Sequence, residues 1–396
     1  MMVLSFYCDS PKSDTIYNNE TRPHSLISRD EYCLERANDS REGLWGYVKQ
    51  SRVEDLEMAN KDLNKAMAAK KVEFYTRLED IEKELKHYRH HFKGKTVLCN
   101  CDDPRCSNFF RYFTLNFEVL GLKKVIATCY KNQDVDLFSQ HECEKAVYQI
   151  YEGDKNHNRK VDNEEIEVKY LEGDGDFRSK ECVALLEEAD IVVTNPPFSL
   201  FREFVSFLVQ HNKKFLIIGN INAIKYKEIF PLIMGNKLWL GASIHSGDRE
   251  FQVPDDYPLQ ASSCRIDENG KKYIRVKGVR WYSNLDYDER YEDIPLFKKY
   301  TPQEYPTYIN YNAIEVSKTA DIPCDYDGLM GVPITFMDKY NPDQFEIIGM
   351  SLDLADMSII RERLGRNDGG PTFYIEKNGK LVRLYDRIAI RRKVKK

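Results

Sequence analysis

The stretch IVVTNPPFSLFREFVSFLVQ, residues 191–210, decides the fold. It begins with β-branched apolar residues that are typical of a buried strand. After Asn195-Pro196-Pro197-Phe198 it continues with apolar residues three or four positions apart, the spacing of a helix that buries one face. Two consecutive prolines stiffen the connection, because each fixes φ and removes a backbone donor. The stretch therefore predicts a strand, a rigid turn and a helix, which is one unit of an α/β sheet.

The same alternation extends to both sides of this stretch. Short β-rich runs occur at residues 96–100, 123–130, 190–195 and 213–219, and helical spacers such as 108–120 separate most of them. Strands that alternate with helices predict a parallel, doubly wound sheet. Such sheets bind ligands at the carboxyl ends of their strands. Residues 237–245 are expected to add a further strand.

The regions before and after this β/α stretch differ from it in amino-acid composition and in expected secondary structure. Residues 1–50 are polar and irregular, and helices are predicted over 51–71 and 78–91. After Gly247, Tyr, Pro, Asp and Gly become frequent, and strands are expected within 273–282 and 345–349. A chain of 396 residues usually forms more than one domain. We therefore predict a catalytic domain over 51–246 and a mixed α+β domain over 247–396.

Composition favours a soluble protein in a reducing compartment. Hydrophobic residues make up 42% and charged residues 31% of the chain, and no apolar run approaches the length of a membrane span. The N-terminus lacks a signal-peptide pattern, and the ten cysteines show no framework spacing. We expect a cytoplasmic location.

The net charge of −5 does not by itself indicate a nucleic-acid partner. Local neutralisation of phosphates matters more than the total charge. Basic residues concentrate at the end, where Lys377–Lys396 hold nine Lys or Arg and one acid, Asp386. This end is interpreted either as a DNA contact or as a solvated tail.

The residue types of the turn suit one kind of chemistry. Residues before proline are extended, which lets the Asn195 side-chain oxygen and the Pro196 carbonyl face one small pocket as two acceptors. Phe198 offers a ring on which a planar base can stack. An aromatic amine is a poor nucleophile because its nitrogen lone pair is delocalised into the ring. When two acceptors take hydrogen bonds from both of its hydrogens, the lone pair becomes localised on the nitrogen. The nitrogen can then attack a sulfonium methyl group in line. Such catalysis depends on orientation and preorganised electrostatics. The four letters also fit a proline-rich turn with a core phenylalanine, but their place after a buried strand favours the catalytic interpretation.

Longer strings support that interpretation through a resemblance. The sequence resembles the EcoRI-type adenine-specific DNA methyltransferase family over roughly residues 50–396. The strings that carry the resemblance are KVEFYTRLEDIEKEL (71–85), VLCNCDDPRCSNFFRYF (97–113), GDGDF (173–177), VVTNPPFS (192–199), GNINAIKYKEIFPLI (219–233), GVRWYSNLD (278–286) and MGVPITFMDKYNP (330–342).

The resemblance implies a Rossmann-like methyltransferase sheet followed by a target-recognition domain over 247–396. It implies a site-specific enzyme of the modification-methylase type, as found in restriction-modification systems, that transfers a methyl group from S-adenosylmethionine to N6 of a flipped-out adenine in double-stranded DNA; whether a restriction nuclease accompanies it stays open. The catalytic residues would be Asn195, Pro196, Pro197 and Phe198. We expect a monomer that does not physically require a companion nuclease.

The resemblance also implies a cofactor site built from several strand ends. Phe74, Tyr75 and Thr76 match the string that closes over the methionine end of the cofactor, although Thr76 and Glu79 also fit a helix capping box. The remaining candidates are Asn100, Asp102, Asp103, Asp174, Asp176 and Phe177.

Three points about these candidates stay open. Either Asp102 or Asp103 would contact the amino group of the cofactor, in a loop without the glycines that usually follow the first strand. GDGDF is interpreted either as an acceptor for the adenine amine of the cofactor or as a solvated acidic turn. The usual ribose-binding carboxylate is absent after the second strand, where Tyr130 and Asp134 follow instead.

Metal chemistry is not expected. Cys99, Cys101 and Cys106 lie near His87, His90 and His91 in the sequence, but no paired CxxC is present. The residues offered for DNA contact combine aromatic and basic groups, and most of them are expected to be ordinary surface or core residues. They are Arg275, Lys277, Arg280, Trp281 and Tyr282.

Three rival functions use some of the same features. A methyltransferase for adenine in RNA shares the chemistry. A protein-glutamine N5-methyltransferase also uses an Asn-Pro-Pro motif, but Phe198 and the 150 residues after the sheet argue against it. A DNA-binding protein without catalysis is disfavoured by the intact motif.

Overall fold

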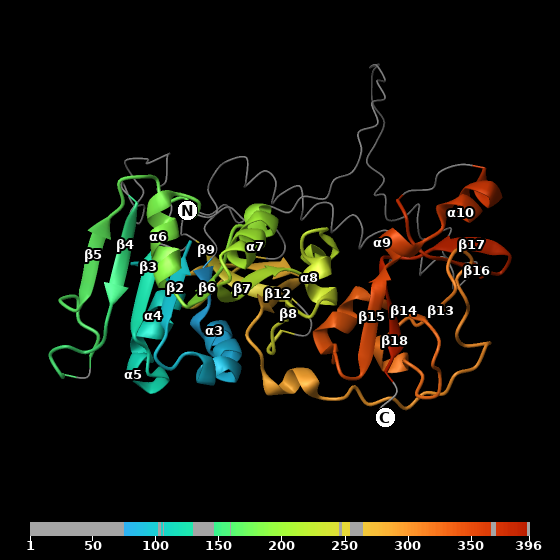
Figure 1. The fold of residues 1–396 in the computed structure, drawn as a ribbon, viewed down its shortest axis with the longest axis horizontal. Helices are drawn as coiled ribbons and strands as arrows, with labels where there is room; N and C mark the ends of the chain where they lie inside the picture. The colour runs from blue at the N-terminus through green and yellow to red at the C-terminus, as the bar shows by residue number, and fades with distance from the viewer. Residues whose placement is uncertain are drawn as a thin grey trace, which may run out of the picture.

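The computed structural model describes residues 75–101, 104–105, 107–129, 146–158, 160–244, 248–253, 264–365 and 370–393 (Figure 1). The irregular segment predicted over 1–50 and the helix predicted over 51–71 lie outside the described residues. The described part is a mixed α/β structure with several sheets.

A central eight-stranded sheet carries the predicted β/α units. Its strands, in spatial order, are β5 (Ile166–Tyr170), β4 (Val147–Tyr151), β3 (Lys124–Thr128), β2 (Thr96–Asn100), β6 (Ile191–Thr194), β7 (Lys214–Asn220), β12 (Val279–Ser283) and β8 (Trp239–Leu240). The four central strands, β3, β2, β6 and β7, are parallel. The outer strands pair antiparallel, so the prediction of a parallel sheet is correct only for the centre.

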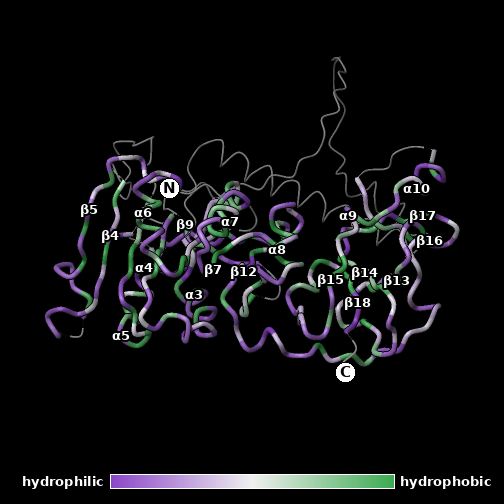
Figure 2. The backbone as a smooth tube through the Cα atoms, viewed as in Figure 1, coloured by the Kyte–Doolittle hydropathy of each residue, from purple (hydrophilic) through white to green (hydrophobic). Residues whose placement is uncertain are grey.

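Helices cover both faces of this sheet. Side chains alternate along β2, so that Val97 and Cys99 join one core while Leu98 joins the other. The first face packs against α3 (Leu78–Leu85), α4 (Asn108–Leu115) and α5 (Phe117–Leu120). The second packs against α6 (Lys180–Glu188), α7 (Phe201–Gln210) and α8 (Phe230–Met234). Figure 2 shows the edge strand β5 as largely hydrophilic, in keeping with its exposed side chains.

The helix predicted over 78–91 is present, but its second half is a 3₁₀ helix and not an α-helix. After α3 the chain forms the 3₁₀ helix η2 (Lys86–His91). Helix α3 begins without a side-chain cap, because its N-cap residue is Arg77 and Thr76 lies in a strand. The capping box expected from Thr76 and Glu79 is therefore wrong.

A small antiparallel sheet packs on the α3 and α4 side through Phe251, Val253, Ile274 and Val276. Its order is β1 (Tyr75–Thr76), β9 (Asp248–Val253), β11 (Lys272–Lys277) and β10 (Cys264–Ile266). The strand expected within 273–282 is in fact two strands, β11 and β12, separated by Gly278 with φ of +73°. Through this turn β12 joins the central sheet, although its residues were assigned to the C-terminal domain.

A second four-stranded sheet lies near the C-terminus. Its order is β13 (Ile314–Glu315), β14 (Met330–Pro333), β18 (Arg387–Arg392) and β15 (Phe345–Met350). The hairpin β16 (Tyr374–Lys377) and β17 (Lys380–Arg383) and the helices α9 (Ser351–Leu354) and α10 (Met357–Leu364) accompany it. Short 3₁₀ helices connect the parts: η3 (Phe198–Leu200), η4 (Ile221–Lys225), η5 (Asp288–Tyr291), η6 (Thr319–Asp321) and η7 (Ile334–Lys339).

The basic end belongs to this sheet. Arg391 pairs with Glu346 and Arg392 with Asp327, both at 2.7 Å. As far as Lys393, the interpretation as a solvated tail is wrong, since β18 lies between β14 and β15.

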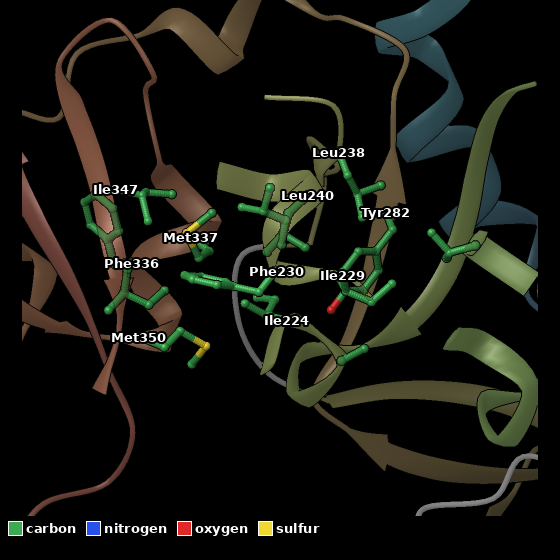
Figure 3. Packing of buried hydrophobic residues seen from close by; sticks show 14 of the residues in the cluster. Ile224, Ile229, Phe230, Leu238, Leu240, Tyr282, Phe336, Met337, Ile347 and Met350 are labelled. Carbon is green, nitrogen blue, oxygen red and sulfur yellow. The ribbon is translucent and has the colours of Figure 1, made fainter. Parts of the chain in front are cut away.

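One continuous apolar cluster joins the central sheet to the C-terminal sheet. Figure 3 shows Phe230, Leu240 and Tyr282 from the first packing toward Phe336 and Met337 from the second. Beside them, Arg280 of β12 donates two hydrogen bonds to Asp338 of η7. Arg280, Trp281 and Tyr282 are at most 3% exposed, so three of the five residues offered for DNA contact are core residues. Arg275 and Lys277 of β11 are exposed.

Candidate active site

The Asn-Pro-Pro-Phe motif follows the buried strand β6. Asn195 is 2% exposed and Pro196 is buried, while Pro197 is half-buried and has an extended backbone. The Leu200 amide donates to the Pro197 carbonyl at 2.9 Å, which closes a tight turn into η3 and then α7. The motif thus holds Asn195 at the carboxyl end of a central strand, on a short connection with little conformational freedom.

The neighbouring strand ends meet at the same edge. The Thr194 hydroxyl donates to the Asn100 carbonyl, which ties the end of β6 to the end of β2. The Cys101 amide donates to the Thr128 carbonyl at 2.8 Å, which ties β2 to β3. Cys101 has φ of +96°, a region that favours glycine. The loop after β2 therefore makes a glycine-like turn although it contains no glycine.

Residues before α3 reach this edge as well. Asn108, the first residue of α4, donates from Nδ2 to the Thr76 carbonyl at 2.8 Å. This bond places Tyr75 and Thr76 beside the loop that leaves β2. Thr76 Oγ1 and Asn100 Oδ1 are both buried, and neither has a hydrogen-bond partner in the described part of the chain. Two buried polar atoms without partners fit a ligand that supplies the missing bonds.

The GDGDF loop packs against the chain that leaves β3. Gly175 has φ of +79°, and a Cβ there would overlap the Cys129 carbonyl oxygen, so the position requires glycine. Asp174 Oδ1 accepts from the Asp176 amide at 3.0 Å, which fixes the turn. The loop lies beside the end of β3, with Asp174 partly exposed.

The other two candidates of this loop already have partners. Arg178 donates from Nη2 to Asp176 Oδ2 at 2.6 Å, and this hydrogen bond lowers the pKa of the Asp176 carboxyl. Phe177 packs edge-on against Phe204 and Phe207 of α7, with ring centroids 5.1 and 5.2 Å apart. Within this loop, Asp174 is therefore the carboxylate better placed to bind a ligand.

Phe198 lies in the core cluster of the first sheet face and is 6% exposed. Stacking of a base on this ring requires that it be uncovered when substrate binds. Its role in stacking stays a prediction.

Several expectations lie outside the described residues. Among the candidates these are Phe74, Asp102 and Asp103, together with Cys106, Tyr130 and Asp134. In the part of the chain that the structure describes, no group of three or more His, Cys, Asp or Glu is arranged to hold a metal ion. No helix in the described ranges is long and apolar enough to cross a membrane.

Sequence reasoning missed the residues that hold the site together. Thr194 and Asn108 each join two segments at this edge, and Arg178 joins the GDGDF loop to Glu203 of α7 at 2.7 Å. A polar residue at the end of a buried strand was the available signal for Thr194. Asn108 and Arg178 gave no such signal, because their partners are distant in sequence or depend on the shape of the turn.

Comparison with known proteins identifies the family to which the chain belongs. The model of the family described as "Adenine-specific methyltransferase EcoRI" matches residues 62–393. The chain belongs to this family of adenine-specific methyltransferases. Every candidate site residue from Phe74 to Phe198 lies inside the matched region.

Curated relatives agree with the family assignment. The chain is 51% identical over 304 residues to the Type II methyltransferase M.EcoRI of Escherichia coli, covering 76% of this chain and 93% of that protein. It is 39% identical over 290 residues to M.MgeORF184P of Mycoplasma genitalium, covering 72% and 84%. M.MpnI of Mycoplasma pneumoniae is also 39% identical, over 289 residues, with the same coverage. No solved structure matches.

Proposed function

We propose that this adenine-specific enzyme methylates N6 of adenine in double-stranded DNA, and that the carboxyl edge of the central sheet is its active site. The observation that carries the proposal is the convergence of Asn195, Asn100 and Thr76 at one edge, through the bonds of Thr194 and Asn108. Family membership argues for adenine and against a protein glutamine as the target.

The sheet supports a Rossmann-like methyltransferase fold. Four parallel strands have helices on both faces, and the antiparallel strand β12 is inserted between β7 and β8. In sheets of this kind, ligands bind at the carboxyl ends of the parallel strands. Asn195 and Asn100 both occupy such ends.

The residues at this edge fit S-adenosylmethionine. Asn100 Oδ1 and Thr76 Oγ1 offer buried polar atoms without partners, and Asp174 offers a partly exposed carboxylate for an amine. When bound, this cofactor supplies a methyl group activated by a positive sulfur. We propose that Tyr75, Thr76, Asn100 and Asp174 hold it, and that Asp176 and Phe177 shape the loop.

Asn195 and Pro196 would then grip the target amine. The side-chain oxygen of Asn195 and the carbonyl of Pro196 accept its two hydrogens, so that the nitrogen lone pair is localised and directed toward the methyl group. The rigid diproline turn keeps both acceptors fixed, so little reorganisation is needed at the moment of reaction. Extrusion of the adenine from the duplex brings it to this edge, because a stacked and paired amine cannot be attacked in line.

Transfer of tritium from labelled S-adenosylmethionine tests the proposal. The purified full chain is incubated with plasmid DNA, total RNA or a protein extract. We expect label in DNA alone, as N6-methyladenine after digestion. Label in RNA or in glutamine instead would contradict the proposal. A monomer that acts without a nuclease stays a prediction, which sedimentation of the active enzyme tests.

A further inference from the structure

A line of contacts leads from the catalytic turn to the C-terminal part. Arg202 lies in the first turn of α7, shortly after Phe198, and is exposed. Its guanidinium lies 5.0 Å from the centroid of the Tyr226 ring. Among the described residues, no acidic side chain pairs with it. The charge of Arg202 is therefore available at the edge where Asn195 lies.

The contacts continue from Tyr226 to its neighbour Lys225, which reaches the C-terminal part of the chain. Lys225 ends η4, the segment that follows the carboxyl end of β7. Its Nζ donates to Asp386 Oδ2 at 2.9 Å. Asp386 immediately precedes β18, so this ion pair fixes the start of β18 beside the carboxyl edge of the central sheet.

Tyr385, next to Asp386, is 80% exposed. Its carbonyl accepts from Arg387 Nη1 at 3.2 Å, and Arg387 is in turn held by Glu315 at 2.8 Å. The backbone is thus anchored while the aromatic ring projects from the surface. A large exposed aromatic side chain on a fixed backbone suits stacking on a planar partner.

We propose that Arg202 and Tyr385 contact the duplex DNA on either side of the Lys225–Asp386 ion pair, with Arg202 on a phosphate and Tyr385 stacked on a base that extrusion of the target adenine uncovers. This inference rests on the proposed function. A cation beside the catalytic turn complements the phosphate backbone. Extrusion leaves a neighbouring base without its stacking partner, and an aromatic side chain replaces that partner.

DNA binding by fluorescence anisotropy over a salt series tests the proposal, with a duplex that contains the mapped methylation site. Tyr385→Ala is expected to raise the dissociation constant by about 5- to 100-fold without changing the salt slope. Arg202→Gln is expected to lower the slope of log K against log salt by about 0.9. Both side chains are exposed, so thermal unfolding is expected to match the wild type.

Matched controls come from the other end of the C-terminal sheet. Phe297 is 83% exposed and Lys299 is also exposed. Both residues come shortly after Ile294, whose backbone is hydrogen-bonded to the Gln344 side chain. Gln344 lies beside the end of β18, whereas Tyr385 lies just before the start of β18. Phe297→Ala and Lys299→Gln are expected to bind DNA as the wild type does.

The outcomes separate this inference from the function on which it rests. A wild-type dissociation constant for Tyr385→Ala, or a wild-type slope for Arg202→Gln, overturns the inference alone when the wild type methylates the same duplex. Equal losses in the controls overturn it too. Absence of methyl transfer to DNA by the wild type overturns the proposed function and the inference together.

Discussion

At the carboxyl edge of the central sheet, Thr76 Oγ1 and Asn100 Oδ1 are buried and have no partner among the described residues, whereas in the C-terminal sheet Glu315 is surrounded by donors. Glu315 is 4% exposed and accepts from Arg387 Nη2 at 2.8 Å and from the Tyr308 hydroxyl at 2.5 Å. Burial and the Glu315 carboxylate raise the pKa of Tyr308, so it stays a donor at neutral pH.

The difference separates a binding site from a scaffold. A buried polar atom without a partner costs about 1–3 kcal/mol, and this cost is offset when a ligand supplies the bond. Among the described residues, no buried side-chain nitrogen or oxygen of the C-terminal sheet lacks a hydrogen-bond partner. We therefore expect substitutions in the scaffold to change stability and substitutions at the edge to change binding and turnover.

The largest effect is expected from Arg387→Met. Removing one partner of a buried ion pair leaves Glu315 uncompensated, so the free energy of unfolding should fall by about 3–5 kcal/mol. Chemical denaturation of the variant and the wild type measures this loss of free energy of unfolding. Arg391→Met is the control, because its pair with Glu346 is half exposed and should contribute at most about 1 kcal/mol. Equal losses for the two variants would contradict the description of the C-terminal sheet as a buried scaffold.

Asn195→Ala should change turnover instead. Loss of one acceptor for the amine is expected to lower kcat by about 10²–10³, as for comparable donors at oxyanion sites, while cofactor affinity stays close to the wild type. Single-turnover methyl transfer measures the loss. Asn222→Ala, exposed in η4 at the same edge, is the control and should keep wild-type kcat. Near-normal turnover of Asn195→Ala would refute the proposed role.

Two threonines compare the regions directly. Thr76→Val removes a buried hydroxyl that has no partner among the described residues, so it should weaken cofactor binding about tenfold. In the cofactor-free protein it should not lower the free energy of unfolding, and it should raise it by up to about 1–3 kcal/mol because the unpaired group is gone. Thr372→Val removes a buried hydroxyl that donates to the Leu384 carbonyl at 3.1 Å, so it should lower stability by about 1 kcal/mol and leave cofactor affinity unchanged. Calorimetric titration and denaturation measure both variants. The reverse pattern would contradict the distinction.

The smallest effect is expected from Cys101→Gly. Glycine accepts the observed φ without strain, so the free energy of unfolding should stay within about 1 kcal/mol of the wild type. Cys99→Gly, at a buried position of β2 with ordinary strand geometry, should cost more. Chemical denaturation measures both variants. If Cys101→Gly lost more free energy of unfolding than Cys99→Gly, the Cys101 side chain would contribute more to stability than its backbone strain costs.

The sequence predicted the local units of the fold well, since they depend on residues close together in the chain. The strand before Asn195 and the helix after it follow from apolar spacing, and both are present. A strand was expected within 273–282, but the antiparallel pairing of its second part, β12, with β7 was not predicted, because this pairing depends on residues about 60 positions away. Gly278 within a strand-like stretch was the signal that one strand would become two.

Side-chain roles were predicted less well than positions. Trp281 and Arg280 have the composition of a DNA contact, but β12 is covered on both faces and buries them. Asp174 and Asp176 are equivalent in sequence and differ only because Arg178 folds back on one of them. Such distinctions arise from tertiary contacts that spacing does not encode.

Fluorescence of 2-aminopurine tests the central claim most directly, that an adenine leaves the duplex and enters the edge beside Asn195. The probe is placed at the mapped target position in one duplex and one base away in another, and wild-type enzyme is added with cofactor. Extrusion removes the probe from the quenching stack at a cost of a few kcal/mol, so a marked increase is expected at the target position only. Equal fluorescence at the two positions would contradict the account.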